Sequence, residues 1–381
     1  MKVALVTHSF LPNSIGGREK YIYDLARMLI EKGNEVKIFT CSDSILKKSF
    51  YTRNSLVIDY LPTLRFPLLE GIYRIPLMFF LRLLKKDFDL IHAHDFHHFT
   101  TFISSIATKI INKPLVVTEH GYPEQVGLMK SAMSFFDTLF LPKIKNSSRK
   151  IIAVSNFIKN ELVSKYNIPK KKIEVIYNSI ILKEYKEKSE IFREIYGLKD
   201  KRVILSVGRV IKEKGFQYLI KALPIILKKV KNVKIVIIGP PSQFKNALIS
   251  LAKKIGVEDK IVFCGVVSDE MLKSALYCSD IVVIPSLYEP FGIVALEAMA
   301  YSKPTVASKI GGLMEIITHN QNGLLVQPGN SFQLANAIIK VLEDKNLAKK
   351  LGRRARECVK RYDWKRNVCE ILRVYEEAIS C

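Results

Sequence analysis

The chain has 381 residues, 48% of them hydrophobic and 10% aromatic, which excludes a disordered protein and allows two domains. Its six cysteines show no Cys-x-x-Cys spacing, which favours buried thiols in a reducing compartment over a disulfide framework. The opening apolar run is too short for a signal peptide, and no uncharged stretch is long enough to span a bilayer, so we expect a cytoplasmic protein.

The formal net charge is +24. Nucleic acid is not expected as a partner, because no zinc-finger, helix-turn-helix or RNA-binding signature is present. Two interpretations stay open. The lysines can cover a solvated surface, or they can attract phosphorylated substrates and anionic headgroups at the inner face of a membrane.

Short apolar runs alternate with helical patterns along the whole chain, which predicts a parallel α/β architecture. The loop between the first strand and its helix contains Gly16 and Gly17. A glycine pair at this place lets the backbone approach a ligand closely, although it can also serve only to make a turn. Expected strands of the first half are 2–6, 35–40, 56–60, 114–118, 150–154 and 173–177.

The segment from Arg65 to Lys86 combines bulky apolar residues with flanking basic ones. This pattern is typical of an amphipathic helix at a membrane interface. A core helix of the first domain, with its aromatic residues packed inward, is the alternative.

Histidines and carboxylates gather near two strand ends. The group His92, His94, Asp95, His97 and His98 could supply metal ligands, but it falls on a strand end and the loop after it, and we do not expect a metal site here. The strand 114–118 delivers His120 to its carboxyl end, where open parallel sheets bind their ligands.

The second half begins with a charged stretch, 181–201, which we interpret as a linker with a short helix. A strand at 202–207 then delivers Gly208 and Arg209 to a loop, and Lys214 and Gly215 precede the next helix. The stretch 261–268, which includes Val266, is expected to form a strand and a loop that seat a nucleotide base.

One stretch has the strongest chemical signal. After a strand at 280–284, Glu289 stands before Pro290, so its backbone should be extended, and Pro290 is expected to open a helix that contains Glu297. The amides of Phe291, Gly292 and Ile293 would then form an anion site at the helix N-terminus. Two carboxylates beside an anion site suit a sugar, a diphosphate and a ribose.

The motif Pro285-Ser-x-x-Glu289-Pro-Phe-Gly292, followed by Glu297-Ala-Met-Ala300, resembles the Glu-x7-Glu segment of glycosyltransferase family 4. These enzymes are retaining, use nucleotide sugars and have the GT-B fold. The resemblance implies two Rossmann-like α/β domains with parallel sheets that face each other across an interdomain cleft. Residues 1–180 would form the acceptor domain and residues 181–361 the nucleotide-sugar domain, with the terminal helix 362–381 packed back on the first.

The resemblance also implies roles for individual residues. Glu289 would contact the donor sugar, Glu297 the ribose hydroxyls, and His120 the sugar near its reacting carbon. Arg209 and Lys214 would bind the diphosphate without a metal ion, since fixed cations in a dry site can stabilise the leaving phosphate. The remaining residues of the expected donor site are Gly16, Gly17, Val266, Phe291, Gly292 and Ile293, and the pair Gly311 and Gly312 would support the Glu297 helix.

The sequence departs from the family pattern at Ser179, where Asn-Gly is common, and at Pro240, where an acidic residue is common. The implied reaction is a front-face transfer, with no cofactor, from a nucleotide-diphosphate sugar to a glycan or lipid-linked hydroxyl. A non-catalytic or epimerase-type protein that binds sugar nucleotides is the alternative. The base, the sugar and the acceptor stay open.

Overall fold

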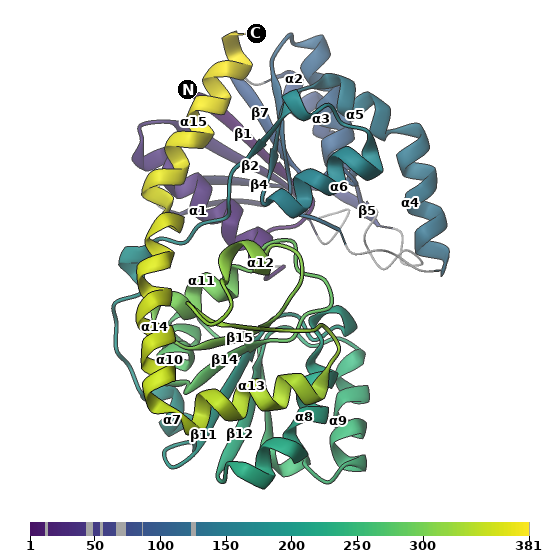
Figure 1. The fold of residues 1–381 in the computed structure, drawn as a ribbon. Coiled ribbons are helices and arrows are strands. Elements are labelled where there is room, and N and C mark those ends of the chain that lie inside the picture. The colour runs from purple at the N-terminus through teal and green to yellow at the C-terminus, as the bar shows by residue number, and fades with distance from the viewer. Residues whose placement is uncertain are drawn as a thin grey trace. The chain divides into compact units, whose positions relative to one another are not determined.

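The computed structural model describes residues 1–11, 14–42, 49–53, 56–65, 74–85, 87–122 and 127–380. The chain divides into two compact units, and each is described here by itself (Figure 1). Unit 1 comprises Met1–Asn178 and Trp364–Cys381, and unit 2 comprises Ser179–Asp363. The division falls two residues before the expected boundary at 180, and the terminal helix groups with unit 1.

Unit 1 contains an eight-stranded sheet in the order β10-β9-β8-β7-β1-β2-β4-β3. All its neighbouring strands are parallel except β3, which runs antiparallel to β4 at the edge. Its strands are β1 (Lys2–Thr7), β2 (Glu35–Cys41), β3 (Ser49–Arg53), β4 (Leu56–Leu61), β7 (Leu90–His94), β8 (Leu115–Glu119), β9 (Ser148–Ala153) and β10 (Ile173–Val175).

The helices of unit 1 lie between these strands in sequence. They are α1 (Gly17–Glu31), α2 (Phe79–Leu84), α3 (Phe99–Ile110), α4 (Gly127–Leu139), α5 (Leu141–Ser147), α6 (Asn156–Tyr166), a short 3-10 turn (Lys170–Lys172) and the terminal α15 (Trp364–Ser380). Ser155 caps α6 by accepting a hydrogen bond from the Ile158 amide, as its sequence position predicts.

The terminal helix α15 contributes large side chains to the core of unit 1. Trp364 and Tyr375 are fully buried, and the Trp364 ring lies 5.1 Å from that of Tyr21 in α1. The Tyr375 hydroxyl lies 2.6 Å from His92 Nδ1 in β7. Helix α15 is therefore an integral part of this unit.

The described part of the segment 65–86 contains no long amphipathic helix. It forms a small antiparallel hairpin of β5 (Thr63–Arg65) and β6 (Arg74–Pro76), followed by the six-residue α2. Phe79 and Leu83 are buried, as the core interpretation predicts, whereas Met78 and Leu81 are exposed. Pro67 and Lys86 lie outside the described residues, and contact with an anionic membrane stays a prediction.

Unit 2 contains a six-stranded, entirely parallel sheet in the order β13-β12-β11-β14-β15-β16. Its central strands have side chains buried on both faces, which explains their continuous apolar runs. The strands are β11 (Arg202–Val207), β12 (Val233–Ile238), β13 (Ile261–Gly265), β14 (Ile281–Ile284), β15 (Thr305–Ser308) and β16 (Leu324–Val326).

Helices connect the strands of unit 2, and the apolar face of α8 contributes to its core. The helices are α7 (Ile191–Ile195), α8 (Phe216–Lys229), α9 (Phe244–Lys254), α10 (Asp269–Cys278), α11 (Ile293–Ala300), α12 (Leu313–Ile316), α13 (Ser331–Glu343) and α14 (Lys345–Val359). Short 3-10 turns lie at Leu182–Glu184, Lys212–Lys214, Glu258–Lys260 and Lys360–Tyr362.

The described cysteines are free thiols that differ in exposure. Cys41 and Cys278 are buried, whereas Cys369 is exposed, so the expectation of buried thiols is wrong for Cys369.

The stretch 181–201 contains the short helix that its pattern predicts, α7, but the rest is not a loose linker. Tyr185, Phe192 and Leu198 are buried in unit 2, and the Phe192 amide donates to Ser274 Oγ at 3.1 Å. Because most residues of this stretch are polar or charged, its sequence pattern does not reveal the few apolar residues that anchor it to unit 2.

We predict that Phe192→Ala destabilises unit 2 by about 3 to 5 kcal/mol, because the substitution leaves a cavity at a fully buried position. Ile195→Ala in the same helix is the control, since that side chain is 59% exposed, and its cost should stay within about 0.5 kcal/mol. Urea denaturation measures both. Equal midpoints for the two variants would show that α7 does not anchor the stretch.

Candidate active site

Several sequence-predicted site residues follow the carboxyl ends of strands, and in each unit some of them lie near the place where the strand order reverses. In unit 1, β1 lies between β2 and β7, and in unit 2, β11 lies between β12 and β14. Connections on the two sides of such a central strand diverge, which leaves a crevice for ligands in parallel α/β sheets. The loops after β11 and β14 carry Arg209, Lys214 and Glu289.

Glu289 is held by a cation and a hydroxyl. Lys214 Nζ donates to Glu289 Oε2 at 2.8 Å, and Ser286 Oγ donates to the same oxygen at 2.9 Å. Glu289 is only 9% exposed, and the Lys214 side chain is 23% exposed. These charge-assisted bonds fix the carboxylate beside a partly accessible ammonium group.

The loop that carries Glu289 packs directly on Gly312. The Gly312 amide donates to the Glu289 carbonyl at 3.0 Å, and a Cβ at Gly312 would lie 2.4 Å from Phe291 Cα. Gly312 therefore supports the loop that carries Glu289, whereas support of the Glu297 helix by the glycine pair stays a prediction. Because Gly292 adopts a φ of 110°, the backbone cannot be helical before it, and α11 begins at Ile293. The expectation that Pro290 opens the helix is wrong.

Glu297 lies inside α11, as predicted, and is 3% exposed. The Tyr185 hydroxyl donates to its Oε1 at 2.9 Å. The two carboxylates of the motif thus have different donors, an ammonium and a hydroxyl for Glu289 and a phenol for Glu297.

The other predicted donor residues of unit 2 differ in exposure. The Lys214 side chain would lie 3.5 Å from a Cβ at Gly208, whereas Arg209 is exposed and its side chain makes no hydrogen bond or ion pair with the described residues. Val266 is 47% exposed just after β13, where it can contact a ligand. Phe291 is 2% exposed, so its side chain belongs to the core and only its backbone can serve a ligand.

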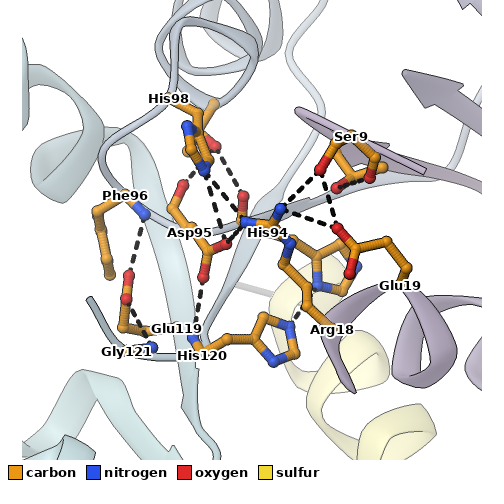
Figure 2. A network of polar contacts seen from close by, with 12 residues as sticks. Ser9, Arg18, Glu19, His94, Asp95, Phe96, His98, Glu119, His120 and Gly121 are labelled. Atoms are coloured by element: carbon orange, nitrogen blue, oxygen red, sulfur yellow. Dashed lines mark hydrogen bonds and ion pairs between the residues drawn. The ribbon is translucent and has the colours of Figure 1, made fainter. Parts of the chain in front are cut away.

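Unit 1 contains a buried polar network, shown in Figure 2. Arg18 lies at its centre, with Nη1 2.7 Å from Asp95 Oδ2 and Nη2 3.0 Å from Glu19 Oε1. Nη2 also donates to Ser9 Oγ at 2.7 Å. Burial alone would raise the pKa of Asp95, but the Arg18 guanidinium holds that pKa well below its usual range. The network therefore contains a cation compensated by two carboxylates.

His120 is bound to this network through its backbone and its ring. Its amide donates to Asp95 Oδ1 at 3.0 Å, and its Nε2 lies 3.1 Å from His94 Nδ1 (Figure 2). Burial lowers the pKa of His120 to about 4, so its imidazole is neutral at pH 7. A neutral ring can donate or accept a hydrogen bond without adding a charge.

The glycine pair at the start of α1 makes room for a carboxylate. Gly16 is extended, with a φ of −171°, and Gly17 is the first residue of the helix. A Cβ at Gly16 would lie 2.8 Å from Glu19 Oε2. A side chain at Gly16 would therefore disturb the network around Arg18.

The histidines considered as metal ligands bind other protein groups. His92 Nε2 lies 2.7 Å from Thr118 Oγ1, and the rings of His8 and His98 stack with centroids 4.2 Å apart. Within the ranges that the structure describes, no cluster of His, Cys, Asp and Glu is arranged to hold a metal ion.

Glu119 is a buried carboxyl next to His120. Its Oε2 accepts from the Phe96 amide and its Oε1 from the Gly121 amide, both at 3.0 Å. Burial, together with the nearby charge of Asp95, raises the pKa of Glu119 to about 7. The pH range of its titration therefore includes neutrality.

Sequence reasoning missed four contributors to these clusters: Arg18, Ser286, Tyr185 and, as a partner of His120, Asp95. Ser286 stands inside the quoted motif around Glu289, and Arg18 directly follows the pair Gly16 and Gly17, so their positions were a usable signal. Tyr185 lies 112 residues from its partner Glu297, and no local pattern connects them.

Two α/β units with parallel sheets, each with polar residues at its strand-order reversal, define the GT-B class of glycosyltransferases. The model for "Glycosyltransferase Family 4" matches residues 15–184, and the model for "Glycosyl transferases group 1" matches residues 188–358. An uncharacterized glycosyltransferase of Methanocaldococcus jannaschii is 34% identical, with 100% of this chain and 99% of the relative covered. The chain belongs to glycosyltransferase family 4 and is an enzyme that transfers a sugar from a nucleotide sugar.

Solved structures share the fold at low identity. Sucrose-phosphate synthase from Thermosynechococcus elongatus has a TM-score of 0.84 at 22% identity and covers 100% of this chain and 99% of its own. The Anabaena protein HepE, in complex with UDP and glucose, has a TM-score of 0.82 at 22% identity and covers 99% of this chain and 100% of its own. The described helices include none with the length and apolar character needed to cross a membrane.

We predict a pH-dependent stability difference between Glu119→Gln and the unsubstituted chain. Between the unfolded pKa of 4.5 and the folded value of about 7, the folded chain keeps a proton that the unfolded chain has lost. The contribution of Glu119 to the free energy of unfolding therefore falls as the pH rises through this window. Glutamine does not titrate. Between pH 4.5 and 7.5, the free energy of unfolding of the variant should therefore rise by on the order of 2 to 3 kcal/mol relative to that of the unsubstituted chain.

Urea denaturation at several pH values measures this difference, and its slope is independent of any constant cost of the amide. Glu35→Gln, at an exposed position of the same unit, is the matched control. If the difference in free energy of unfolding between Glu119→Gln and the unsubstituted chain did not change with pH, the raised pKa of Glu119 would be wrong.

Proposed function

We propose that the chain is a retaining glycosyltransferase that moves a sugar from a nucleotide-diphosphate sugar to a hydroxyl acceptor without a metal ion. The observation that carries this proposal is the cluster of Lys214, Glu289 and Ser286 at the carboxyl ends of β11 and β14, with Arg209 beside it in sequence. It combines an ammonium group held by an ion pair with a carboxylate held by two donors.

The leaving group determines the role of the cations. As the bond between sugar and diphosphate breaks, negative charge grows on the β-phosphate. Lys214 and the exposed Arg209 both follow β11, and we propose that both bind the diphosphate, where cations stabilise the growing negative charge. The amides of Ile293 and Val294 precede the first hydrogen bond of α11, which Ala295 donates to the Gly292 carbonyl at 2.9 Å, and this helix N-terminus adds a favourable dipole.

The carboxylates and the histidine would orient the sugar and the ribose. Glu289 would accept hydrogen bonds from donor-sugar hydroxyls, and Glu297 from the ribose hydroxyls. His120 would serve as a neutral hydrogen-bonding group near the reacting carbon. Neutrality suits this role, because an imidazolium would repel the positive charge of an oxocarbenium-like transition state.

Retention of configuration would follow from a front-face displacement, in which the departing phosphate takes the proton of the acceptor hydroxyl. The bond from the anomeric carbon to the phosphate oxygen breaks, a bond to the acceptor oxygen forms on the same face, and the proton leaves with the nucleoside diphosphate. HepE, which shares the fold, was solved with UDP and glucose, and this supports a nucleoside diphosphate as the leaving group.

The direct test is a screen of UDP-, GDP-, ADP- and CDP-sugars in the presence of EDTA, without an acceptor. We expect one nucleotide class to raise the melting temperature and to release its diphosphate slowly, because water can replace the acceptor. Stabilisation without any release, even with added acceptors, would favour a non-catalytic binding protein. No response to any donor would refute the proposed function.

We predict that Arg209→Ala and Lys214→Ala each raise the barrier by about 2 to 4 kcal/mol, by analogy with removal of one oxyanion-stabilising donor. This corresponds to a loss in kcat/KM of about 30- to 1,000-fold. Lys212→Ala is the matched control, because Lys212 is exposed in the same 3-10 turn as Lys214. Full turnover in both alanine variants would remove these residues from the site.

A further inference from the structure

Tyr185 connects the stretch after β10 to the second carboxylate of the site. It follows the 3-10 turn Leu182–Glu184, and its hydroxyl donates to Glu297 Oε1 at 2.9 Å. Both side chains belong to residues that are 3% exposed. A buried hydrogen bond to a carboxylate is stronger than one between neutral groups, so it constrains both partners.

The Tyr185 ring is itself held from two directions. Lys273 Nζ lies 5.5 Å from the ring centroid, and the Tyr301 ring packs on it edge-to-face with centroids 5.7 Å apart. Lys273 also pairs with Asp269 at 2.6 Å and with Glu184 at 3.5 Å. The phenol is thus fixed before any ligand arrives, and it can fix the carboxylate in turn.

A phenol differs from a basic residue as a partner for this carboxylate. It restrains rotation of the carboxylate through one oxygen while adding no charge. A carboxylate has about four acceptor positions, and the Tyr185 hydroxyl occupies one of them. A carboxylate oriented in advance loses less freedom when a ligand with two adjacent hydroxyls binds.

We propose that Tyr185 is a positioning residue that orients Glu297 toward the ribose hydroxyls and so makes the site selective for ribonucleotides over nucleotides that lack these hydroxyls. This inference rests on the proposed function, in which Glu297 binds the ribose. Tyr185 acts only through Glu297, and its hydroxyl matters to the extent that the ligand offers ribose hydroxyls.

Tyr301 provides a matched control. It packs against Tyr185, and its hydroxyl is buried with no hydrogen-bond partner in the described structure. Tyr185→Phe and Tyr301→Phe therefore each remove one buried hydroxyl from the same aromatic pair. The first removes a bond to Glu297, and the second does not.

The experiment measures dissociation constants of the unsubstituted chain and both variants by calorimetry. The probes are UDP and 2′,3′-dideoxy-UDP, with the corresponding ADP, GDP and CDP pairs in parallel, so that the identity of the base does not decide the outcome. We expect Tyr185→Phe to weaken binding of the ribonucleotide about 3- to 10-fold. Its effect on the dideoxynucleotide should be about twofold or less, and Tyr301→Phe should leave the ratio of the two constants unchanged.

The outcomes separate this inference from the proposed function. If Tyr185→Phe weakened binding of the ribonucleotide and of the dideoxynucleotide equally, the hydroxyl would only support the fold. This result would overturn the inference and leave the proposed function intact. A change of the ratio in Tyr301→Phe as large as in Tyr185→Phe would also overturn it. If the unsubstituted chain bound none of the diphosphates, the proposed function would be refuted, and the inference that rests on it would be refuted as well.

Discussion

The candidate site of unit 2 depends on backbone segments that meet without side chains between them. A Cβ at Gly215 would lie 1.9 Å from the Pro285 carbonyl oxygen, and one at Gly312 would lie 2.4 Å from Phe291 Cα. The backbones of the loops after β11, β14 and β15 therefore pack against one another in van der Waals contact. This close approach brings Lys214 to Glu289, and any larger residue would move the loops apart.

The two carboxylates of the Glu-x7-Glu motif have different surroundings although they come from one short segment. Glu289 lies in a loop beside a cation, whereas Glu297 lies in a helix and receives the hydroxyl of Tyr185. A carboxylate next to a cation suits a place near a phosphate. One held by a neutral group is suited to accept hydroxyls, since its negative charge is not opposed by that partner.

In unit 1, a network of charged groups holds a neutral histidine in place. Arg18 compensates Glu19 and Asp95, and Asp95 in turn accepts the His120 amide. Removing one member of such a buried group leaves an unpaired charge, which is costly. Asp95 also adopts a left-handed φ of 66°, a strained conformation that its surrounding hydrogen bonds maintain.

The sequence by itself determined the alternating strands and helices, the parallel sheets and the place of Glu289, Glu297 and His120 at or after strand ends. It could do so because apolar periodicity and residues next to proline or glycine act locally. It failed at Pro290, because the φ of 110° at Gly292 prevents a helix from starting before Ile293, and at the antiparallel edge strand β3, which lacks a distinctive local pattern.

Only the tertiary structure decided which groups meet across long stretches of chain. The partners Arg18 and Asp95 are 77 residues apart, and Tyr185 and Glu297 are 112 apart. Such contacts depend on strand order and on how the loops pack, and these are properties of the whole unit. The pKa values of Glu119 and His120 follow from the same packing, because burial and neighbouring charge, and not residue type, set them.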